Sequence, residues 1–316
     1  MVASNTFVPK MPDDMTPARG AFLSHANYIQ AFDHLMSAYY LPDRGLFTFW
    51  APLESLYEAI AVAVRASRLW NRLQRRPQTD VNEVTRILRN AWSTESLLAL
   101  TGEFATDEII GTANNWAVVQ GYYASYHVSQ ALFVARGDAR ANTHETGQSQ
   151  FAAFWARPSI SLPPWSLGWG PTGYLNVPNG IEVITPRSPW IGCDDRSCWG
   201  LLGMALRTTR NDTIDEQLVM ARERKRAERR RLWRQQEAAR LAEGRRARAE
   251  PAFPRRPQLT GGEKQQVMDH VRAHGILDYL YRLRIRSNYL DTTMFEDGPE
   301  RVHLSSAMGR QSVSQM

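Results

Sequence analysis

The stretch from Trp116 to His144 reads WAVVQGYYASYHVSQALFVARGDARANTH. Apolar and aromatic side chains recur in it at helical spacing, and they cover so much of the circumference that the helix should be buried. Gly137 suits the end of this helix, because glycine adopts a left-handed backbone at little cost. The sequence therefore predicts a buried helix over residues 114–136, followed by a break and then a Thr-His pair.

Helical periodicity extends over most of the chain. Further helices are predicted over residues 21–41, 51–75, 80–100, 146–156, 212–249 and 261–290. Asp80 is a suitable N-cap for the third helix. The inward face of that helix is predicted to consist of Val84, Ile87, Leu88 and Trp92. The pattern as a whole predicts an all-α fold.

Residues 157–211 differ from the helices on either side, because they are rich in Pro, Gly and Trp, which are typical of loops. We expect this segment to be an excursion from the bundle, held to it by Trp165, Trp169 and Trp190. The alternative is a surface on which bases or a substrate stack. The general tendency of aromatic side chains to be buried favours packing.

Cysteines and apolar runs indicate neither a metal centre nor a membrane span. Cys193 and Cys198 are the only cysteines and lie in the loop-like segment CDDRSC without a neighbouring histidine, so we interpret them as ordinary loop cysteines. We predict no metal and no cofactor. No apolar run is long enough to cross a bilayer, and the N-terminus lacks the features of a signal peptide, which together indicate a cytoplasmic protein.

The positive charge of the chain is concentrated in one segment. Between Arg222 and Arg248, twelve Lys or Arg residues stand against four Glu, a local charge of +8, whereas the whole chain carries +6. Strong helix formers predict a long, exposed helix there, capped by Asp212 or Thr213 and ended by Pro251.

Two interpretations of this basic helix remain open. In the first it contacts a nucleic-acid backbone through four arginines: Arg226, Arg230, Arg234 and Arg245. In the second it is a solvated helix with Glu–Arg pairs such as Glu223–Arg226 and Glu237–Arg240. The excess of +8 is larger than internal pairing neutralises, which favours an anionic partner: RNA, DNA, an acidic protein or a membrane surface. Few apolar residues lie on the helix, which argues against insertion into a membrane.

Two blocks of the sequence resemble the HEPN superfamily, especially its branch paired with nucleotidyltransferases. The first block is YYASYHVSQALFVARG at 122–137, with the Thr-His pair at 143–144. It resembles that family's helix, which reads YYA, a bulky residue and His, then small residues and Leu, and ends at a Gly before a His. The second is LRIRSNYLD at 283–291. It resembles the family's late Arg, two residues, Ala/Ser, Asp/Asn, Tyr pattern at Arg284, Ser287, Asn288 and Tyr289.

The resemblance implies a HEPN-type bundle in which the helices over 114–136 and 261–290 pack together. The Pro/Trp-rich excursion and the basic helix would be inserted between them. It also implies an RNA-binding or RNA-cleaving component of a bacterial defence or toxin–antitoxin system. The partners expected from it are RNA or another nucleic acid, with a protein partner or a second copy of the chain in addition.

The chain departs from the family at one motif. Ribonucleases of the superfamily usually carry an Arg, four to six residues, then a His, whereas here three residues separate Arg140 from His144 and seven separate Arg136 from it. Arg19 and His25 have this spacing but lie outside both blocks. The departure favours an alternative function, a non-catalytic helical module that dimerises or recruits a partner and docks through the basic helix.

Five segments follow from these patterns. Residues 1–156 hold the N-terminal helices and the first HEPN-like block, 157–211 the excursion, and 212–250 the basic helix. Residues 258–295 hold the helix that completes the bundle. Residues 296–316 have little apolar periodicity and are expected to form a disordered tail.

If the chain is an enzyme, a metal-independent ribonuclease is the class expected. His144 would transfer protons, because the pKa of histidine is near neutral, and Arg284 would bind phosphate. Supporting polar residues are Tyr123, His127, Asn288, Tyr289 and Asp291. The structural alternatives are an Arg284–carboxylate pair within the bundle, a His144 bonded to a backbone carbonyl or to Glu145, and a satisfied core histidine at His127. The sequence leaves open whether Arg284 and His144 come together.

Overall fold

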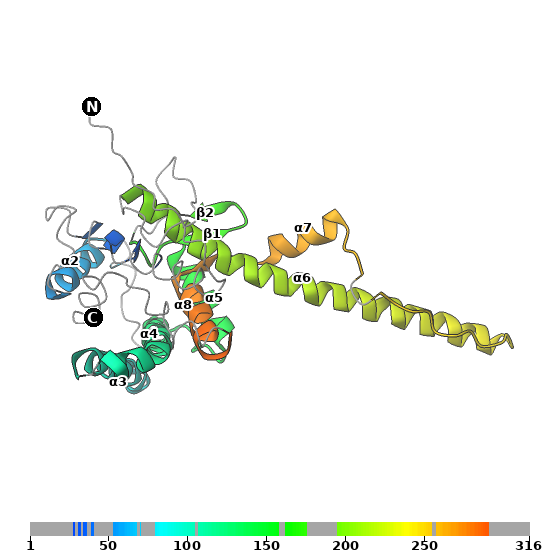
Figure 1. Cartoon of the computed structure of the whole chain (residues 1–316), viewed down its shortest axis with the longest axis horizontal. Helices are drawn as coiled ribbons and strands as arrows, with labels where there is room; N and C mark the ends of the chain where they lie inside the picture. The colour runs from blue at the N-terminus through cyan, green and yellow to red at the C-terminus, as the bar shows by residue number, and fades with distance from the viewer. Residues whose placement is uncertain are drawn as a thin grey trace, which may run out of the picture. The chain divides into compact units, whose positions relative to one another are not determined.

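The structure, a computed structural model, describes residues 28, 31–32, 34–36, 39–40, 53–67, 70, 80–104, 107–157, 162–175, 195–254 and 257–290. Most of these residues are helical, so the predicted all-α class is confirmed (Figure 1). The predictions for Arg19, His25, Trp190, Cys193, Asp291 and the tail 296–316 lie outside the described residues, as does the side chain of Tyr289.

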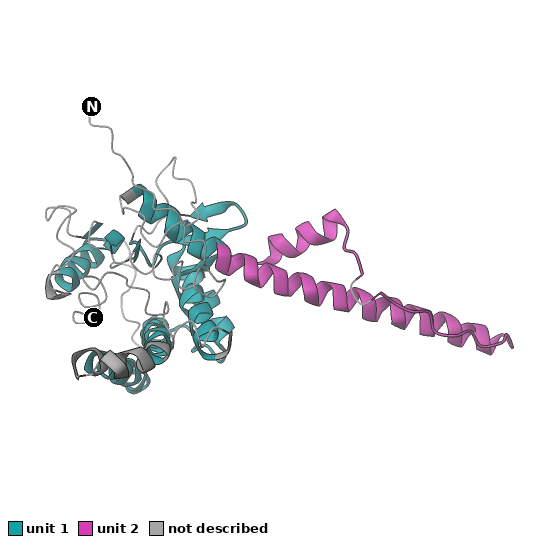
Figure 2. Ribbon diagram, viewed as in Figure 1, with its two compact units in different colours: residues 1–207, 273–316 teal, residues 208–272 magenta. Residues whose placement is uncertain are grey.

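The chain divides into two compact units (Figure 2). The first consists of residues 1–207 and 273–316, and the second of residues 208–272. The second unit contains the whole of the predicted basic helix and is described separately below.

The helices of the first unit are α2 (Leu53–Ala66), α3 (Val81–Phe104), α4 (Asp107–Ala135), α5 (His144–Trp155), the first turns of α6 (Asp195–Ala242), and α8 (Ile276–Ile285) with the π-helical turn Arg286–Leu290. α3 and α5 begin and end close to the predicted positions, whereas α2 ends at Ala66 rather than at residue 75 and α4 begins at Asp107 rather than at residue 114. Asp80 caps α3 as predicted, because its Oδ1 accepts hydrogen bonds from the backbone N–H groups of Asn82 and Glu83 at 2.9 and 3.1 Å. Gly137 follows α4 with a φ of +80°, as its predicted role requires.

The predicted helix over 261–290 is interrupted, which corrects the sequence interpretation. It consists of α7 (Gly261–His270) and α8, separated by the short strand β3 (His274–Gly275). β3 pairs antiparallel with β1 (Gly168–Gly170), which also pairs with β2 (Gly173–Leu175). The backbone of β3 is therefore bonded to a segment distant in sequence, and a helical pattern in the local sequence does not reveal that pairing.

The described residues 162–175 of the Pro/Trp-rich excursion contain β1 and β2 of this small sheet. Trp165 packs on the cluster around Tyr122 and Phe133, and Trp169 packs on a second cluster around Leu167 and Tyr279. The predicted role of these two tryptophans as packing anchors is therefore confirmed.

Three further local predictions are wrong. α6 begins at Asp195, so Asp212 and Thr213 lie inside the helix rather than at its cap. For the same reason Cys198 is a fully buried helical residue and not a loop cysteine. Trp92 was expected to face inward on α3 but is 54% exposed, whereas Ile87, predicted on the same face, is buried.

The packing of α4 against α8, the central architectural prediction, is confirmed. The side chains of Tyr122 and Phe133 on α4 share one hydrophobic cluster with Leu277 on α8. The aromatic rings of Tyr122 and Tyr281 lie with their centroids 5.4 Å apart. α3 lies alongside α4 and contributes a smaller cluster around Ile87 (Figure 1).

The second unit is a helical hairpin rather than a layered core. The chain turns at Gly244, whose φ is +75°, and the following residues run back beside α6 to α7 (Figure 1). Lys225 on α6 donates hydrogen bonds of 2.7 and 2.6 Å to the Glu263 carboxylate on α7. Arg210, only 5% exposed, donates to the carbonyl oxygens of Met268, Val271 and Arg272 at the end of α7. Polar contacts of this kind hold the hairpin together, and few of its apolar side chains are buried.

Candidate functional site: an aromatic His–Arg site and a basic hairpin

His144 and Arg284 come together in the first unit. The imidazole of His144 lies 5.5 Å from the ring centroids of both Tyr122 and Tyr281. The guanidinium carbon of Arg284 lies 5.6 and 5.3 Å from the same two centroids. The two predicted residues thus flank one pair of tyrosine rings. We call this group, with Tyr123 and Tyr126, the aromatic site.

Three helices position this site. Tyr122, Tyr123 and Tyr126 lie on consecutive turns of α4, one to four residues apart, so that they share one side of the helix. Tyr281 and Arg284 are three residues apart on α8. His144 is the first residue of α5, where the preceding Thr143 caps the helix by accepting a hydrogen bond from the backbone N–H of Thr146 at 3.1 Å.

A hydrogen bond fixes the orientation of the His144 ring. Its Nδ1 lies 2.8 Å from the hydroxyl oxygen of Tyr122. This tyrosine takes the place of the backbone carbonyl or Glu145 carboxylate considered from the sequence. Because Nδ1 is engaged, Nε2 is the nitrogen that remains to exchange a proton with a ligand.

The surroundings keep His144 neutral. Burial lowers the pKa of His144 below its usual 6.5, and the positive charge of Arg284 and the nearby His127 lower it further. Burial also raises the pKa of the Tyr122 and Tyr126 hydroxyls, so these groups keep their protons. The site therefore combines an unprotonated imidazole with protonated phenols at neutral pH.

Arg284 lies against aromatic rings, and it forms no ion pair with a carboxylate of the described residues. Its Nε and Nη1 are buried, and among the described residues neither has a hydrogen-bond partner. Its guanidinium carbon lies over the rings of Tyr122, Tyr123 and Tyr281 at 5.2 to 5.6 Å. Such cation–π contacts are worth roughly 2 kcal/mol or more when desolvated. They leave the N–H donors of Nε and Nη1 without an acceptor in the described part of the chain, and buried donors without an acceptor are costly unless a ligand accepts from them.

The other polar residues predicted to support the site lie in different environments. The ring of His127 stacks on Tyr123 at 6.0 Å, but its buried Nδ1 has no partner in the part of the chain that is described, unlike a satisfied core histidine. Ser287, one of the residues matching the family pattern, donates a 3.0 Å hydrogen bond to the carbonyl of Arg284 and so supports the turn that carries it. Asn288 is half-buried beside this turn.

Sequence reasoning missed two residues of this site. Tyr281 was not selected, although its spacing of three from Arg284 on a helix was a usable signal. Gly147 on α5 permits the close approach of α5 to α4, because a Cβ at this position would lie 2.5 Å from Cε2 of Tyr126 and 3.0 Å from Nε2 of Gln130. The sequence does not show contacts between these helices, so the role of Gly147 was not visible in it.

In the second unit, the predicted arginines of the basic helix have different environments. Arg230 and Arg234 both form ion pairs with Glu250, at 3.0 and 3.9 Å. Arg245 pairs with Glu243 at 3.1 Å. Arg226 is half-buried, its Nε has no hydrogen-bond partner among the residues that the structure describes, and its predicted pair with Glu223 does not form.

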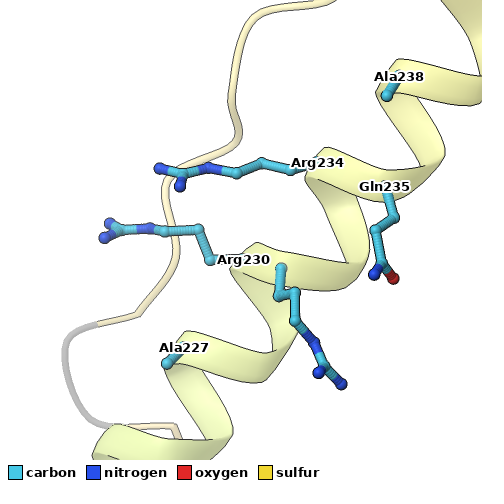
Figure 3. A pocket seen from close by; sticks show the side chains of 6 residues that line it. Ala227, Arg230, Arg234, Gln235 and Ala238 are labelled. Atoms are coloured by element: carbon cyan, nitrogen blue, oxygen red, sulfur yellow. The ribbon is translucent and has the colours of Figure 1, made fainter.

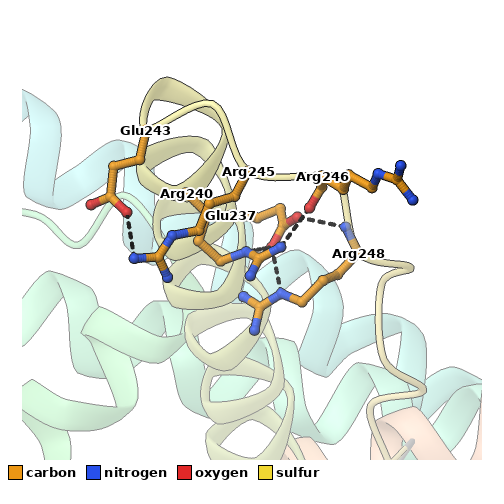
Figure 4. A network of polar contacts seen from close by, with 6 residues as sticks. All are labelled: Glu237, Arg240, Glu243, Arg245, Arg246 and Arg248. Carbon is orange, nitrogen blue, oxygen red and sulfur yellow. Dashed lines mark hydrogen bonds and ion pairs between the residues drawn. The ribbon is translucent and has the colours of Figure 1, made fainter.

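The predicted Glu237–Arg240 pair does form, at 3.4 Å, and it belongs to a larger network (Figure 4). Glu237 also accepts hydrogen bonds from the backbone N–H and the Nε of Arg248, at 2.6 and 2.7 Å. These bonds from Arg248, together with the charges of Arg248 and Arg240, hold the pKa of the Glu237 carboxyl below its usual range. The network joins the end of α6 to the residues that follow the turn.

A shallow hollow of about 450 Å³ lies on α6 (Figure 3). It is lined by Ala227, Arg230, Arg231, Arg234, Gln235 and Ala238. Figure 3 shows Arg230 and Arg234 extending to one side of the helix and Gln235 to the other.

Comparisons with known proteins add no assignment. No family model, no curated protein and no solved structure shows significant similarity to this chain. Within the described residues, no helix has the length and apolar character needed to cross a membrane. Nor do three or more His, Cys, Asp or Glu side chains gather there as metal ligands would.

Proposed function

We propose that this chain is a HEPN-like component of a bacterial defence or toxin–antitoxin system, which binds RNA and cleaves it at the aromatic site without a metal ion. The observation that carries the proposal is the convergence of a neutral His144 and of Arg284, which has no ion-pair partner among the described residues, on the rings of Tyr122 and Tyr281. A neutral imidazole next to buried, unused guanidinium donors matches what phosphodiester cleavage requires, a proton acceptor and an anion-binding group.

The proposed reaction begins at the ribose 2′-hydroxyl. His144 Nε2 takes the proton of this hydroxyl in the tautomer that the proposal requires, in which Nδ1 carries the ring proton and donates it to the Tyr122 hydroxyl 2.8 Å away. The 2′-oxygen bonds to phosphorus and the bond from phosphorus to the 5′-oxygen breaks, which leaves a cyclic phosphate. The 5′-oxygen leaves with the proton that His144 has taken. Arg284 binds the non-bridging phosphate oxygens and stabilises the charge that develops on them.

RNA cleavage in the presence of a chelator tests this proposal. His144→Ala and Arg284→Ala should each lower the rate by about 100-fold or more. Two matched controls, His270→Ala on α7 and Arg89→Ala on α3, remove the same groups from exposed positions and should leave the rate unchanged. If cleavage persists in both site variants, the proposed site is wrong.

A non-catalytic interaction module is the second candidate function. It is favoured by large apolar side chains exposed on α3 and α4, which include Trp92, Leu97, Leu100 and Trp116. The missing Arg-x(4–6)-His spacing in the two resembling blocks favours it as well. Under this candidate, the purified chain cleaves no RNA. Its mass by light scattering is that of a dimer, and Trp92→Glu or Leu97→Glu returns it to a monomer.

A further inference from the structure

The cations of the basic segment from Arg222 to Arg248 fall into two groups. Arg240 and Arg248 pair with the buried Glu237, and Lys225 pairs with Glu263, so these cations hold the hairpin together. By contrast, Arg229 and Arg231 are exposed and form no ion pair within the described residues. Only part of the charge of the basic segment is therefore used by the fold.

The hollow on α6 gathers three of these arginines around a floor of small side chains. Arg230 and Arg234, four residues apart, form one wall (Figure 3). Arg231 and Gln235, also four residues apart, form the other wall, because this spacing places both on the same side of a helix. Ala227 and Ala238 lie between the walls, and their short side chains allow a ligand to approach the helix closely.

The two arginines of one wall already contact an acidic residue of this protein, Glu250. The Glu250 carboxylate lies 3.0 Å from Nε of Arg230 and 3.9 Å from Nη2 of Arg234. Glu250 is partly exposed, and Arg230 Nε forms an ion pair with it but no hydrogen bond. A contact of this kind is weak in water, so a stronger anion can displace it.

We infer that this hollow is a binding groove for the phosphodiester backbone of nucleic acid, with Glu250 as an internal competitor for Arg230 and Arg234. The inference rests on the proposed function, because it names the groove through which the RNA would be held. Guanidinium groups match phosphate oxygens in geometry, and the segment from Arg222 to Arg248 contains only one lysine among its twelve cations.

The lining of the groove favours nucleic acid over the other polyanions. Its apolar residues are two alanines, which provide no pocket for the large side chains that anchor a peptide. They also provide no broad apolar face for insertion into a lipid surface. The Gln235 amide can donate to a phosphate or sugar oxygen without selecting a sequence. We therefore expect binding that depends little on base sequence.

Binding of the full-length chain to a labelled single-stranded RNA oligonucleotide tests the groove. Arg231→Ala should weaken binding about fivefold and lower the magnitude of the salt slope by about 1, the effect of losing one phosphate contact. Arg229→Ala is the matched control, because it removes the same charge from an exposed position of the same helix outside the groove. Glu250→Gln should strengthen binding about threefold, because it removes the competing carboxylate.

Three outcomes would overturn this inference. If Arg229→Ala weakens binding as much as Arg231→Ala, the charge of the helix matters and the groove does not. If Glu250→Gln leaves the affinity unchanged, Glu250 is no competitor. If polyglutamate or vesicles with anionic lipid bind as tightly as RNA, the groove accepts a different polyanion. This binding test is independent of the cleavage test. If RNA binds in the groove but is not cleaved, the proposed cleavage at the aromatic site is wrong, whereas the proposed binding groove is still supported.

Discussion

The aromatic site and the basic hairpin handle positive charge in opposite ways. In the aromatic site one guanidinium is half-buried among tyrosine rings, a neutral histidine lies beside it, and its Nε and Nη1 have no acceptor within the described residues. In the hairpin many guanidinium groups are exposed, and several are paired with Glu. Charges removed from water act strongly over short distances and are screened little, whereas exposed charges act weakly and are screened by salt. Under the proposed function, the aromatic site would cleave RNA and the basic hairpin would bind it.

The largest expected difference between the two regions is in stability. Phe133 is 1% exposed in the cluster between α4, α5 and α8, so Phe133→Ala should lower the free energy of unfolding by about 3–5 kcal/mol. Leu232 on α6 is 44% exposed, and Leu232→Ala should change it by about 0.5 kcal/mol at most. Urea denaturation followed by circular dichroism measures both. Similar losses in the two variants would mean that the hairpin contains a core of its own.

The next difference is kinetic. Arg284→Ala should lower kcat for RNA cleavage by about 100-fold, because its contact is made with the reacting phosphate. The double variant Arg230→Ala, Arg234→Ala should raise KM and change kcat little, because the lost contacts bind substrate and transition state equally. Steady-state kinetics of both variants separates these effects. A large fall in kcat in the hairpin variant would mean that the hairpin arginines also take part in the cleavage step, which contradicts the separate roles of the two regions.

The third difference is in the response to salt. Reversing the charge of four arginines to Glu, at Arg226, Arg230, Arg234 and Arg245, should weaken RNA binding at least about tenfold at low salt, and less as salt is added. The four matching Arg→Lys substitutions keep the charge and should preserve the salt slope. Fluorescence anisotropy at several salt concentrations gives both values. A flat salt response in the unmodified chain would identify the hairpin as a spacer or as an arm that docks on a protein.

The smallest effect concerns protonation in the aromatic site. Because the pKa of His144 is lowered, the unfolded chain takes up a proton at this residue at a higher pH than the folded chain, so His144 should have little effect on stability above pH 6.5 and should reduce stability as the pH falls below it. Arg284→Gln removes a positive charge and should raise the pKa of His144. NMR titration of the imidazole in both proteins measures the change. A lower pKa in the variant would contradict the assigned neighbourhood.

Local features of the sequence predicted local structure well. The Asp80 cap, the end of α4 before Gly137 and the apolar pattern of α4 are decided within a few residues, and the structure confirms them. Contacts between segments that are far apart in the sequence could not be predicted in this way. The strand at His274–Gly275 depends on pairing with Gly168 and Trp169, which lie more than 100 residues away. The proximity of His144 to Arg284 likewise depends on α4, because both residues pack on Tyr122.

The close contact at Gly147 should restrict which residues homologous proteins carry at positions 147 and 126. A side chain at this position would collide with the Tyr126 ring, so the residue at 147 and the size of the residue at 126 are linked. Among homologous chains, we expect position 147 to stay glycine wherever position 126 is aromatic, and to vary only together with a smaller residue there. Searching for a His followed three residues later by Gly, downstream of a Tyr-Tyr-x-x-Tyr helix, offers a way to recognise distant relatives that overall sequence similarity misses.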